Sequence, residues 1–227
     1  MVEIPHRHPE PVPPASQLAV LPFLAAVDGY LREDGNVSGL RITMHRAVSR
    51  EGEGYLQQVC PYLQESGGNA LGTVGRFFPV NDRIMGAAYS SGKIWRTHHY
   101  DSVEALHADL RKTEKGDLSK TPVSYLAIPF LGPQDQVVLI LYADCNELNF
   151  FANDERVEHL VAMSKGLCRL FDWLQKEPFP VLRNFPLQKG TPITGETGLY
   201  EIHEPLSNPT APKFSEVYSF NYEAAVA

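Results

Sequence analysis

The 227-residue chain has little cysteine, no excess of positive charge and no long apolar run, and each shortage excludes a class of protein. The three cysteines, Cys60, Cys145 and Cys168, form no CxxC pair and are too few to hold together a secreted disulfide scaffold. Twenty basic against 27 acidic residues give a formal net charge of -7, which lacks the positive surface that duplex binding needs. No stretch approaches the ~18 apolar residues of a membrane span. We therefore expect a cytoplasmic protein with no nucleic acid and no membrane among its partners.

Proline is scarce in the middle of the chain and concentrated at its ends. Six of the 18 prolines lie near the N-terminus and seven in the last fifty residues. Because proline removes a backbone donor and blocks helix interiors, we expect irregular ends and a regular middle. The sequence predicts a proline-rich segment over 1–21, one domain over 22–176 and a C-terminal extension over 177–227. The extension is rich in aromatic residues such as Tyr200 and Tyr218, so it either packs on the domain or on a protein partner, or forms a loose tail.

The hydrophobic pattern of the middle segment changes several times between helical and strand spacing. It predicts helices over 23–35, 82–91, 101–110 and 153–176, and strands over 40–45, 55–63, 76–80, 94–95, 123–131 and 137–143. Asp101 is the expected cap of the third helix, with Glu104 completing a capping box, and Asn153 or Asp154 is the expected cap of the last. This order predicts an α+β fold, with helices on one face of a sheet and a looser crossover region on the other.

Several segments together resemble a GAF domain. They are the run Gly75-Arg76-Phe77-Phe78-Pro79-Val80, Met85-Gly86, Ser91-Gly92-Lys93-Ile94-Trp95, Ser124 to Phe130, Val138 to Asp144, Phe150-Phe151 and Asp154-Glu155. The resemblance covers roughly Pro22 to Trp173. It implies a six-stranded antiparallel sheet, a ligand cavity between the sheet and its crossover loops, and homodimerisation through the first and last helices.

The resemblance also identifies candidate ligand-binding residues. Aromatic and thioether side chains would form the walls of the cavity, and nearby cationic or polar groups would favour a phosphate or carboxylate on the ligand. The candidates are Arg76, Phe78, Met85, Tyr89, Trp95, Arg96, His98 and Tyr125. The same apolar residues would serve equally well in a packed core, and the sequence leaves this alternative open.

Other chemistries of the family are poorly matched. Phe150, Asp154 and Glu155 form part of a cyclic-nucleotide signature, but no lysine stands beside Asn146, and acidic residues are common in the first turn of a helix. Methionine sulfoxide reductases of this family use a pair of cysteines, whereas position 85 is methionine. We therefore expect no catalytic residues and no enzymatic activity. Cys145, in a loop, remains a minor candidate for a redox-sensitive thiol.

The eight histidines raise the question of a metal site. His98 and His99 are adjacent, and His45 lies on another expected strand. Neighbouring residues of a strand point to opposite faces, so His98 and His99 would not bind one ion together. No HxxxH or CxxC pattern supplies a ligand set, so we expect neither a metal nor a cofactor.

Two functions follow from these patterns. In the first, the protein is a sensor that binds a small molecule, such as a nucleotide or another anionic metabolite, and signals through dimer or partner contacts. In the second, the domain binds no ligand and acts as a dimerisation or adaptor module by protein-protein interaction. No fused output segment is evident in the sequence, so either function would act through a partner chain.

Overall fold

A single antiparallel sheet of seven strands organises the fold, in the order β3-β2-β1-β6-β5-β4-β7. The computed structural model describes residues 12, 14–33, 37–50, 52–63, 74–81, 83–111, 118, 121–132, 134–176 and 200–202; in 14–16, 170–176 and 200–202 the description is of the backbone. The strands are β1 (Arg41–Arg50), β2 (Glu53–Gln58), β3 (Phe77–Pro79), β4 (Trp95–Thr97), β5 (Ser124–Leu131), β6 (Val137–Cys145) and β7 (Tyr200–Ile202). Every neighbouring pair is antiparallel.

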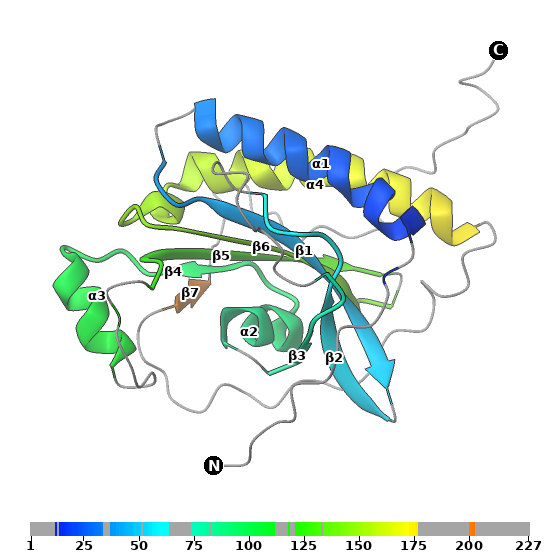
Figure 1. Cartoon of the computed structure of the whole chain (residues 1–227), viewed down its shortest axis with the longest axis horizontal. Helices are drawn as coiled ribbons and strands as arrows, with labels where there is room; N and C mark the ends of the chain where they lie inside the picture. The colour runs from blue at the N-terminus through cyan, green and yellow to red at the C-terminus, as the bar shows by residue number, and fades with distance from the viewer. Residues whose placement is uncertain are drawn as a thin grey trace.

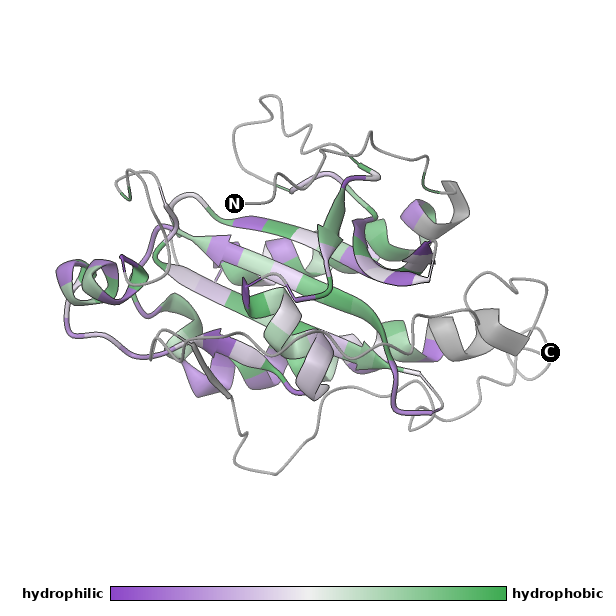
Figure 2. Ribbon diagram, turned by 90° about the horizontal axis from the view of Figure 1, so that it is seen from below, coloured by the Kyte–Doolittle hydropathy of each residue, from purple (hydrophilic) through white to green (hydrophobic). Residues whose placement is uncertain are grey.

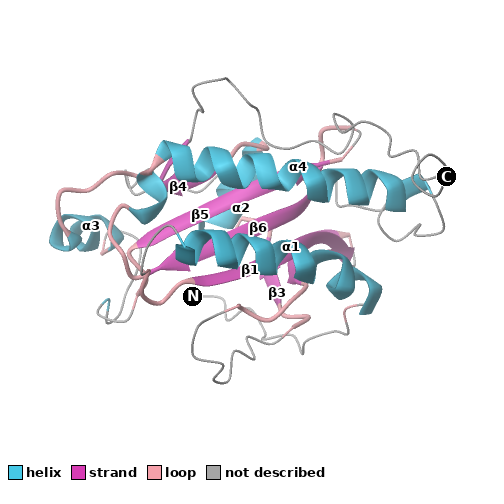
Figure 3. Cartoon of the chain, turned by 90° about the horizontal axis from the view of Figure 1, so that it is seen from above, coloured by secondary structure: helices cyan, strands magenta, loops and turns pink. Residues whose placement is uncertain are grey.

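Helices cover the two faces of the sheet unequally (Figure 1). On one face, α1 (Pro14–Glu33) and α4 (Asp154–Lys176) lie side by side across the central strands, as Figure 3 shows from above. On the opposite face lies the short α2 (Arg83–Ser91), while α3 (Val103–Leu110) lies beyond the end of the sheet. A 3₁₀ turn, η2 (Phe150–Ala152), leads into α4. We call these two sides of the sheet the helix face and the α2 face.

The predicted α+β fold is confirmed, and its six antiparallel strands correspond to β1 to β6. The main hydrophobic core extends over both faces of the sheet, and on the helix face Phe23 of α1 meets Phe130 of β5 edge to face. Figure 2 shows hydrophobic residues continuing along the central strands. The burial of these side chains supplies the main driving force for folding.

The first helix begins earlier than expected. It starts at Pro14 and runs through Pro22, whereas the proline content predicted an irregular segment over 1–21. Val20, Leu24 and Val27 are all buried, so the apolar stripe continues on both sides of Pro22. Burial of this stripe offsets the backbone donor that Pro22 lacks.

The helix caps are partly as predicted. Ser102, and not Asp101, caps α3, because its hydroxyl accepts a hydrogen bond from the Ala105 amide at 3.2 Å. The capping box that the sequence predicted at Asp101 is therefore wrong by one residue. Asn153 is confirmed as the cap of α4, since its Oδ1 accepts from the amide of Arg156 at 2.9 Å.

The C-terminal extension contributes regular structure, which the proline pattern did not predict. Residues 200–202 form β7, which pairs with the outer edge of β4, Trp95 opposite Ile202 and Thr97 opposite Tyr200. Without this pairing the edge of β4 would carry open backbone donors and acceptors. The other aromatic residues of the extension, Tyr218 among them, lie outside the described residues, as do residues 1–11 and 13 of the segment predicted over 1–21.

One glycine is required by a close approach of two backbone segments. A Cβ at Gly86 of α2 would lie 2.4 Å from the carbonyl carbon of Asn81. Only glycine allows α2 to pack against the end of the β3 segment in this way. The match of Met85-Gly86 to the family pattern thus coincides with a packing requirement.

Candidate functional site

On the α2 face, β1 and β6 carry a group of buried polar side chains that includes Thr43, His45 and Asp144. Residues of a strand alternate between faces, so Thr43 and His45 of β1 point to the α2 face while Ile42 and Met44 point to the helices. In the sheet register, Thr43 lies opposite Tyr142, and Arg41 lies opposite Asp144. Two neighbouring strands thereby place a group of polar residues together on one face.

Arg41, Asp144 and Tyr142 form a hydrogen-bonded unit. The Arg41 guanidinium donates to both carboxylate oxygens of Asp144, each at 2.7 Å, and the Tyr142 hydroxyl donates to Oδ2 at 2.8 Å. The Asp144 side chain is 1% exposed and that of Arg41 is 40% exposed. The hydrogen bond to Asp144 raises the pKa of Arg41, and burial raises that of Tyr142. The negative charge of Asp144 is therefore matched, and Tyr142 stays protonated.

His45 lies on the same face, and it is one of the buried side chains whose hydrogen bonding is incomplete. Its side chain is completely buried, yet neither ring nitrogen has a hydrogen-bond partner among the described residues. The imidazole instead packs edge to face with Phe78 and Tyr142, with ring centres 5.2 and 6.2 Å away. Burial, with a smaller effect of the Arg76 charge, lowers the pKa of His45 to about 3. At neutral pH the site therefore presents one free imidazole donor and one free acceptor.

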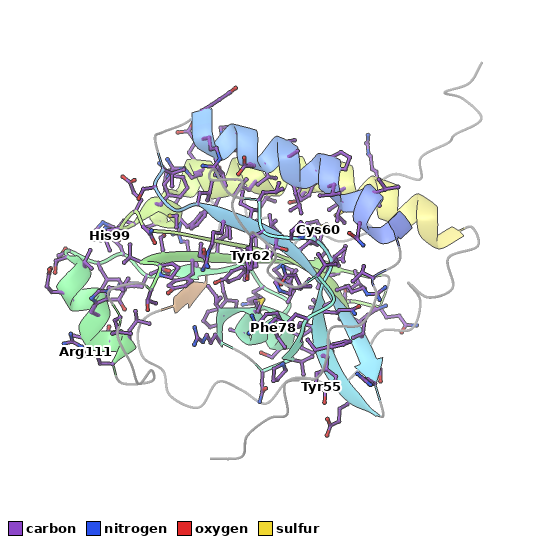
Figure 4. The ribbon with its side chains drawn as sticks, in the orientation of Figure 1. Tyr55, Cys60, Tyr62, Phe78, His99 and Arg111 are labelled. Atoms are coloured by element: carbon purple, nitrogen blue, oxygen red, sulfur yellow. The ribbon has the colours of Figure 1, made fainter. Side chains whose placement is uncertain are left out.

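The residues beside His45 are already hydrogen-bonded. Thr43 Oγ1 and Gln58 Nε2 both donate to the carbonyl oxygen of Cys60, at 2.7 and 2.8 Å. Tyr62 lies over the same face, with the Arg41 guanidinium 5.2 Å from its ring centre, and its ring is 6.4 Å from that of Tyr142. Figure 4 labels Cys60 and Tyr62 near the middle of the sheet and Phe78 on the side where α2 lies.

All five aromatic and thioether residues predicted to bind ligand lie on the α2 side of the sheet. Met85, Tyr89 and Tyr125 are buried members of the main hydrophobic core, and burial raises the pKa of Tyr89 to about 12. Trp95 is half-buried, and its indole Nε1 donates to Ser91 Oγ at 2.8 Å. Phe78 is the fifth, and it is the one that touches His45. The structure thus brings these aromatic and thioether groups together, in closely packed surroundings.

The three predicted polar residues are not gathered at one place. Arg76 is exposed, with its Cζ 4.7 Å from the ring centre of Phe78, close to the α2 face. Arg96 points to the helix face, where its Nη1 lies 2.7 Å from Asp154 Oδ1 at the start of α4. His98 is exposed and packs edge to face with Tyr100. Arg96 and His98 therefore lie apart from the side chains around His45.

Sequence reasoning gave no ligand-binding role to the polar group on β1 and β6. It considered His45 only as a metal ligand, and it did not select Arg41, Asp144 or Tyr142. A signal existed, because polar residues at alternate positions of strands with apolar neighbours indicate a polar patch on one face. Which strands are neighbours, and hence which residues meet, depends on the register of β1 with β6.

The described residues give limited support to other chemistry. No group of three or more histidine, cysteine or acidic side chains among them is arranged to hold a metal ion. Figure 4 places His99 near α3, distant from Phe78. All three cysteines are free and buried, and burial raises the pKa of Cys60 and Cys145 to about 12. Both of these thiols are therefore protonated, and weakly nucleophilic, at neutral pH.

Comparisons with known proteins add little to this description. No protein-family model and no curated protein match the sequence. Among solved structures, the chain is similar to one described as the crystal structure of the IcIR transcriptional regulator from Alicyclobacillus acidocaldarius. The two are 16% identical, the match covers 68% of this chain and 69% of that one, and the TM-score is 0.33. A likeness this distant supports no conclusion about function. None of the described helices has the length and apolar character needed to cross a bilayer.

Proposed function

We propose that this protein is a cytoplasmic sensory or regulatory protein of the GAF type, which binds a small molecule on the α2 face and signals through dimer or partner contacts. The observation that carries the proposal is the completely buried His45, whose two ring nitrogens have no partner among the described residues. Leaving buried polar groups unsatisfied costs about 1–3 kcal/mol for each group, so such a residue calls for an explanation. A ligand that hydrogen-bonds to the imidazole would supply one.

The surroundings of His45 suit a small-molecule site. The rings of Phe78, Tyr62 and Tyr142 provide apolar walls, and Arg41 with Asp144 provides a fixed polar edge. Aromatic walls with a few oriented polar groups are typical of ligand sites. The Arg76 charge near this face favours a nucleotide or another anionic metabolite, as the sequence suggested.

The route for a signal would be the sheet and the helix pair. β1 and β6 carry His45 and Asp144 on one face and pack against α1 and α4 through the other. A conformational change on the α2 face would therefore reach α1 and α4 across a single layer, the sheet itself. We propose that the chain dimerises through α1 and α4, as the resemblance to the GAF family implies. The three free cysteines suit a reducing compartment.

One observation favours the alternative, an adaptor that binds no ligand. Met85, Tyr89 and Tyr125, which were predicted to line a cavity, are between 4 and 7% exposed and belong to the continuous core. If the region around His45 is equally closed, the α2 face is simply a second packed layer. The protein would then act through its helix pair or its C-terminal extension.

A thermal-shift screen discriminates between the two functions. Cyclic nucleotides, amino acids and simple organic and inorganic anions would each be added to the full chain. A ligand that binds only the folded state raises the melting temperature by mass action, by an amount that grows with its concentration. The sensor should respond to at least one class, and the response should be lost in His45→Phe but kept in His98→Phe, an exposed histidine used as the control. A chain that responds to none of the compounds would be an adaptor.

A further inference from the structure

Two basic side chains meet at one aromatic ring on the α2 face. The guanidinium carbon of Arg76 lies 4.7 Å from the centre of the Phe78 ring, and the centre of the His45 ring lies 5.2 Å from the same point. Arg76 is exposed, Phe78 is half-buried and His45 is completely buried. The exposed Arg76 guanidinium and the buried His45 imidazole therefore both pack against the Phe78 ring.

The charges at this place do not cancel within the described part of the chain. Arg41 is matched by Asp144 through two hydrogen bonds, whereas Arg76 has only its contact with the Phe78 ring and no carboxylate partner there. One positive charge is left over, beside a buried imidazole whose nitrogens also lack partners. A ligand group that complements Arg76 and His45 would carry negative charge and more than one acceptor oxygen.

We propose that Arg76 and His45 together bind the anionic group of the ligand, a carboxylate or a phosphate, and that His45 takes up a proton as this anion binds. The inference rests on the small-molecule function proposed above and names the chemistry of its ligand. Arg76 would make the first contact from solvent, and His45 would hold the anion below Phe78. The site would thereby respond to the anion and to pH together.

The proton uptake follows from the forces on His45 in the free protein. Desolvation and the Arg76 charge both disfavour the imidazolium ion. An anion at this place counteracts Arg76 and attracts the proton directly, so it raises the pKa of His45. The neighbouring titratable groups are fixed: Asp144 is paired with Arg41, and burial keeps Tyr142 and Cys60 protonated. At a pH between the His45 pKa of the ligand-free protein and the higher His45 pKa of the complex, binding of one anion is therefore accompanied by uptake of about one proton on the imidazole.

Access to His45 depends on Phe78. Because the imidazole is completely buried, a ligand reaches it only after a covering side chain has moved. Phe78 belongs to β3, a three-residue strand at the edge of the sheet that pairs with β2 alone. Short edge strands are held by few hydrogen bonds, so the Phe78 ring is the cover that moves at the lowest cost.

The test compares three probes on the full chain between pH 5.5 and 7.5. Sodium benzoate supplies a carboxylate, sodium sulfate supplies a phosphate-like oxyanion that does not titrate in this range, and benzamide is the neutral analogue of benzoate. Benzoate stays ionised here, since carboxylic acids have a pKa of ~4. We expect the affinity of at least one anion, measured by calorimetry, to rise by up to about tenfold for each unit of fall in pH, because one proton binds with it. Benzamide should bind weakly, with no pH dependence.

Variants assign the effect to its residues. His45→Gln should remove the pH dependence, Arg76→Gln should weaken anion binding at every pH, and His98→Gln should behave as wild type. Because His45→Gln alters the core, a second measurement uses the wild-type chain. The ring resonances of His45 should show a pKa that rises when the anion is added.

The outcomes separate this inference from the function on which it rests. Anion affinity that does not depend on pH, benzamide binding as tight as that of benzoate, or an unchanged His45 pKa would overturn proton-coupled anion binding and leave the sensor function standing. If only a cyclic nucleotide, an amino acid or another anion of the thermal-shift screen binds, the same pH series is run with that compound: affinity that rises as the pH falls supports the inference, and affinity that does not depend on pH overturns it. If no compound binds, both proposals fail. A preference for benzoate over sulfate, or the reverse, decides between the carboxylate and the phosphate.

Discussion

The two faces of the sheet are made by alternate residues of the same strands, yet they differ in what they bury. On the helix face, the central strands present side chains such as Met44, Phe130 and Leu141, which are all completely buried against α1 and α4. On the α2 face the same strands present His45 and Asp144, which are also completely buried. The helix face lowers the free energy of the fold, whereas burial of polar groups on the α2 face opposes it.

Two buried charged or polar residues of the α2 face, Asp144 and His45, differ in how the cost of their burial is compensated. Asp144 recovers its desolvation cost through Arg41 and Tyr142, while His45 has no such compensation among the described residues. An apolar residue at position 45 would fit the surrounding rings without that cost. Local departures from good packing chemistry are expected at functional sites, which is why the proposals above centre on His45.

The largest effect is expected from the helix face. Phe130→Ala removes a completely buried ring that contacts Phe23 of α1, and it should lower the free energy of unfolding by about 3–5 kcal/mol. Urea denaturation followed by circular dichroism measures the loss. Leu18→Ala, at a position with 70% exposure, is the control and should change the value by less than about 0.5 kcal/mol. A loss below 1 kcal/mol for Phe130→Ala would contradict the account of the core.

The second effect concerns the polar unit of the α2 face. Asp144→Ala leaves the Arg41 guanidinium and the Tyr142 hydroxyl without their acceptor, and it should cost about 2 kcal/mol, since Arg41 is partly solvated. In a double-mutant cycle, the variant that combines Arg41→Met with Asp144→Leu should lose less stability than Arg41→Met alone and Asp144→Leu alone lose together. Additive losses in this double-mutant cycle would show that the pair is not coupled.

The third effect is the pH dependence of stability that His45 contributes on the α2 face. The pKa of His45 is about 3 in the folded chain and ~6.5 when unfolded, so below pH 6.5 the unfolded state binds a proton that the folded state does not. As the pH falls from 6 to 4, His45 alone should therefore lower the free energy of unfolding by up to about 1.4 kcal/mol for each pH unit. In His45→Phe that part of the slope should vanish, as measured by urea denaturation at several pH values. Equal slopes in the two proteins would mean that His45 is not held neutral.

The smallest effect is expected at the edge of the sheet. Truncation after Lys176 removes β7 and its three residue pairs with β4, and it should cost about 1 kcal/mol, since few hydrogen bonds are lost. Mass measurement in solution, beside urea denaturation, would show whether the open β4 edge recruits a second chain. A loss above 3 kcal/mol would mean that the extension is part of the core and not an edge contact.

Most of the fold was predictable because it depends on local periodicity. The alternation in β1, the two apolar runs of β5 and β6, and the stripe of α4 each specify an element from neighbouring residues alone. The sequence-based predictions were wrong where a contact between residues distant in the chain outweighed the local preference. Pro22 lies inside α1 because the stripe on both sides of it is buried, and residues 200–202 form a strand because β4 offers an open edge. Neither contact leaves a signal in the nearby sequence.

The candidate site was predictable only in part. Phe78 and Arg76 were selected from the sequence and lie at the site proposed here, whereas Arg96 is used in an ion pair with Asp154 on the opposite face. The sequence by itself determined which residues share a face of each strand, because a strand has a period of two. The tertiary structure alone decided which strands lie side by side, and so it alone could place Arg41 against Asp144, and Phe78 and Tyr142 against His45. Those pairings join residues far apart in the chain, and they follow from the packing of the whole sheet between its helices.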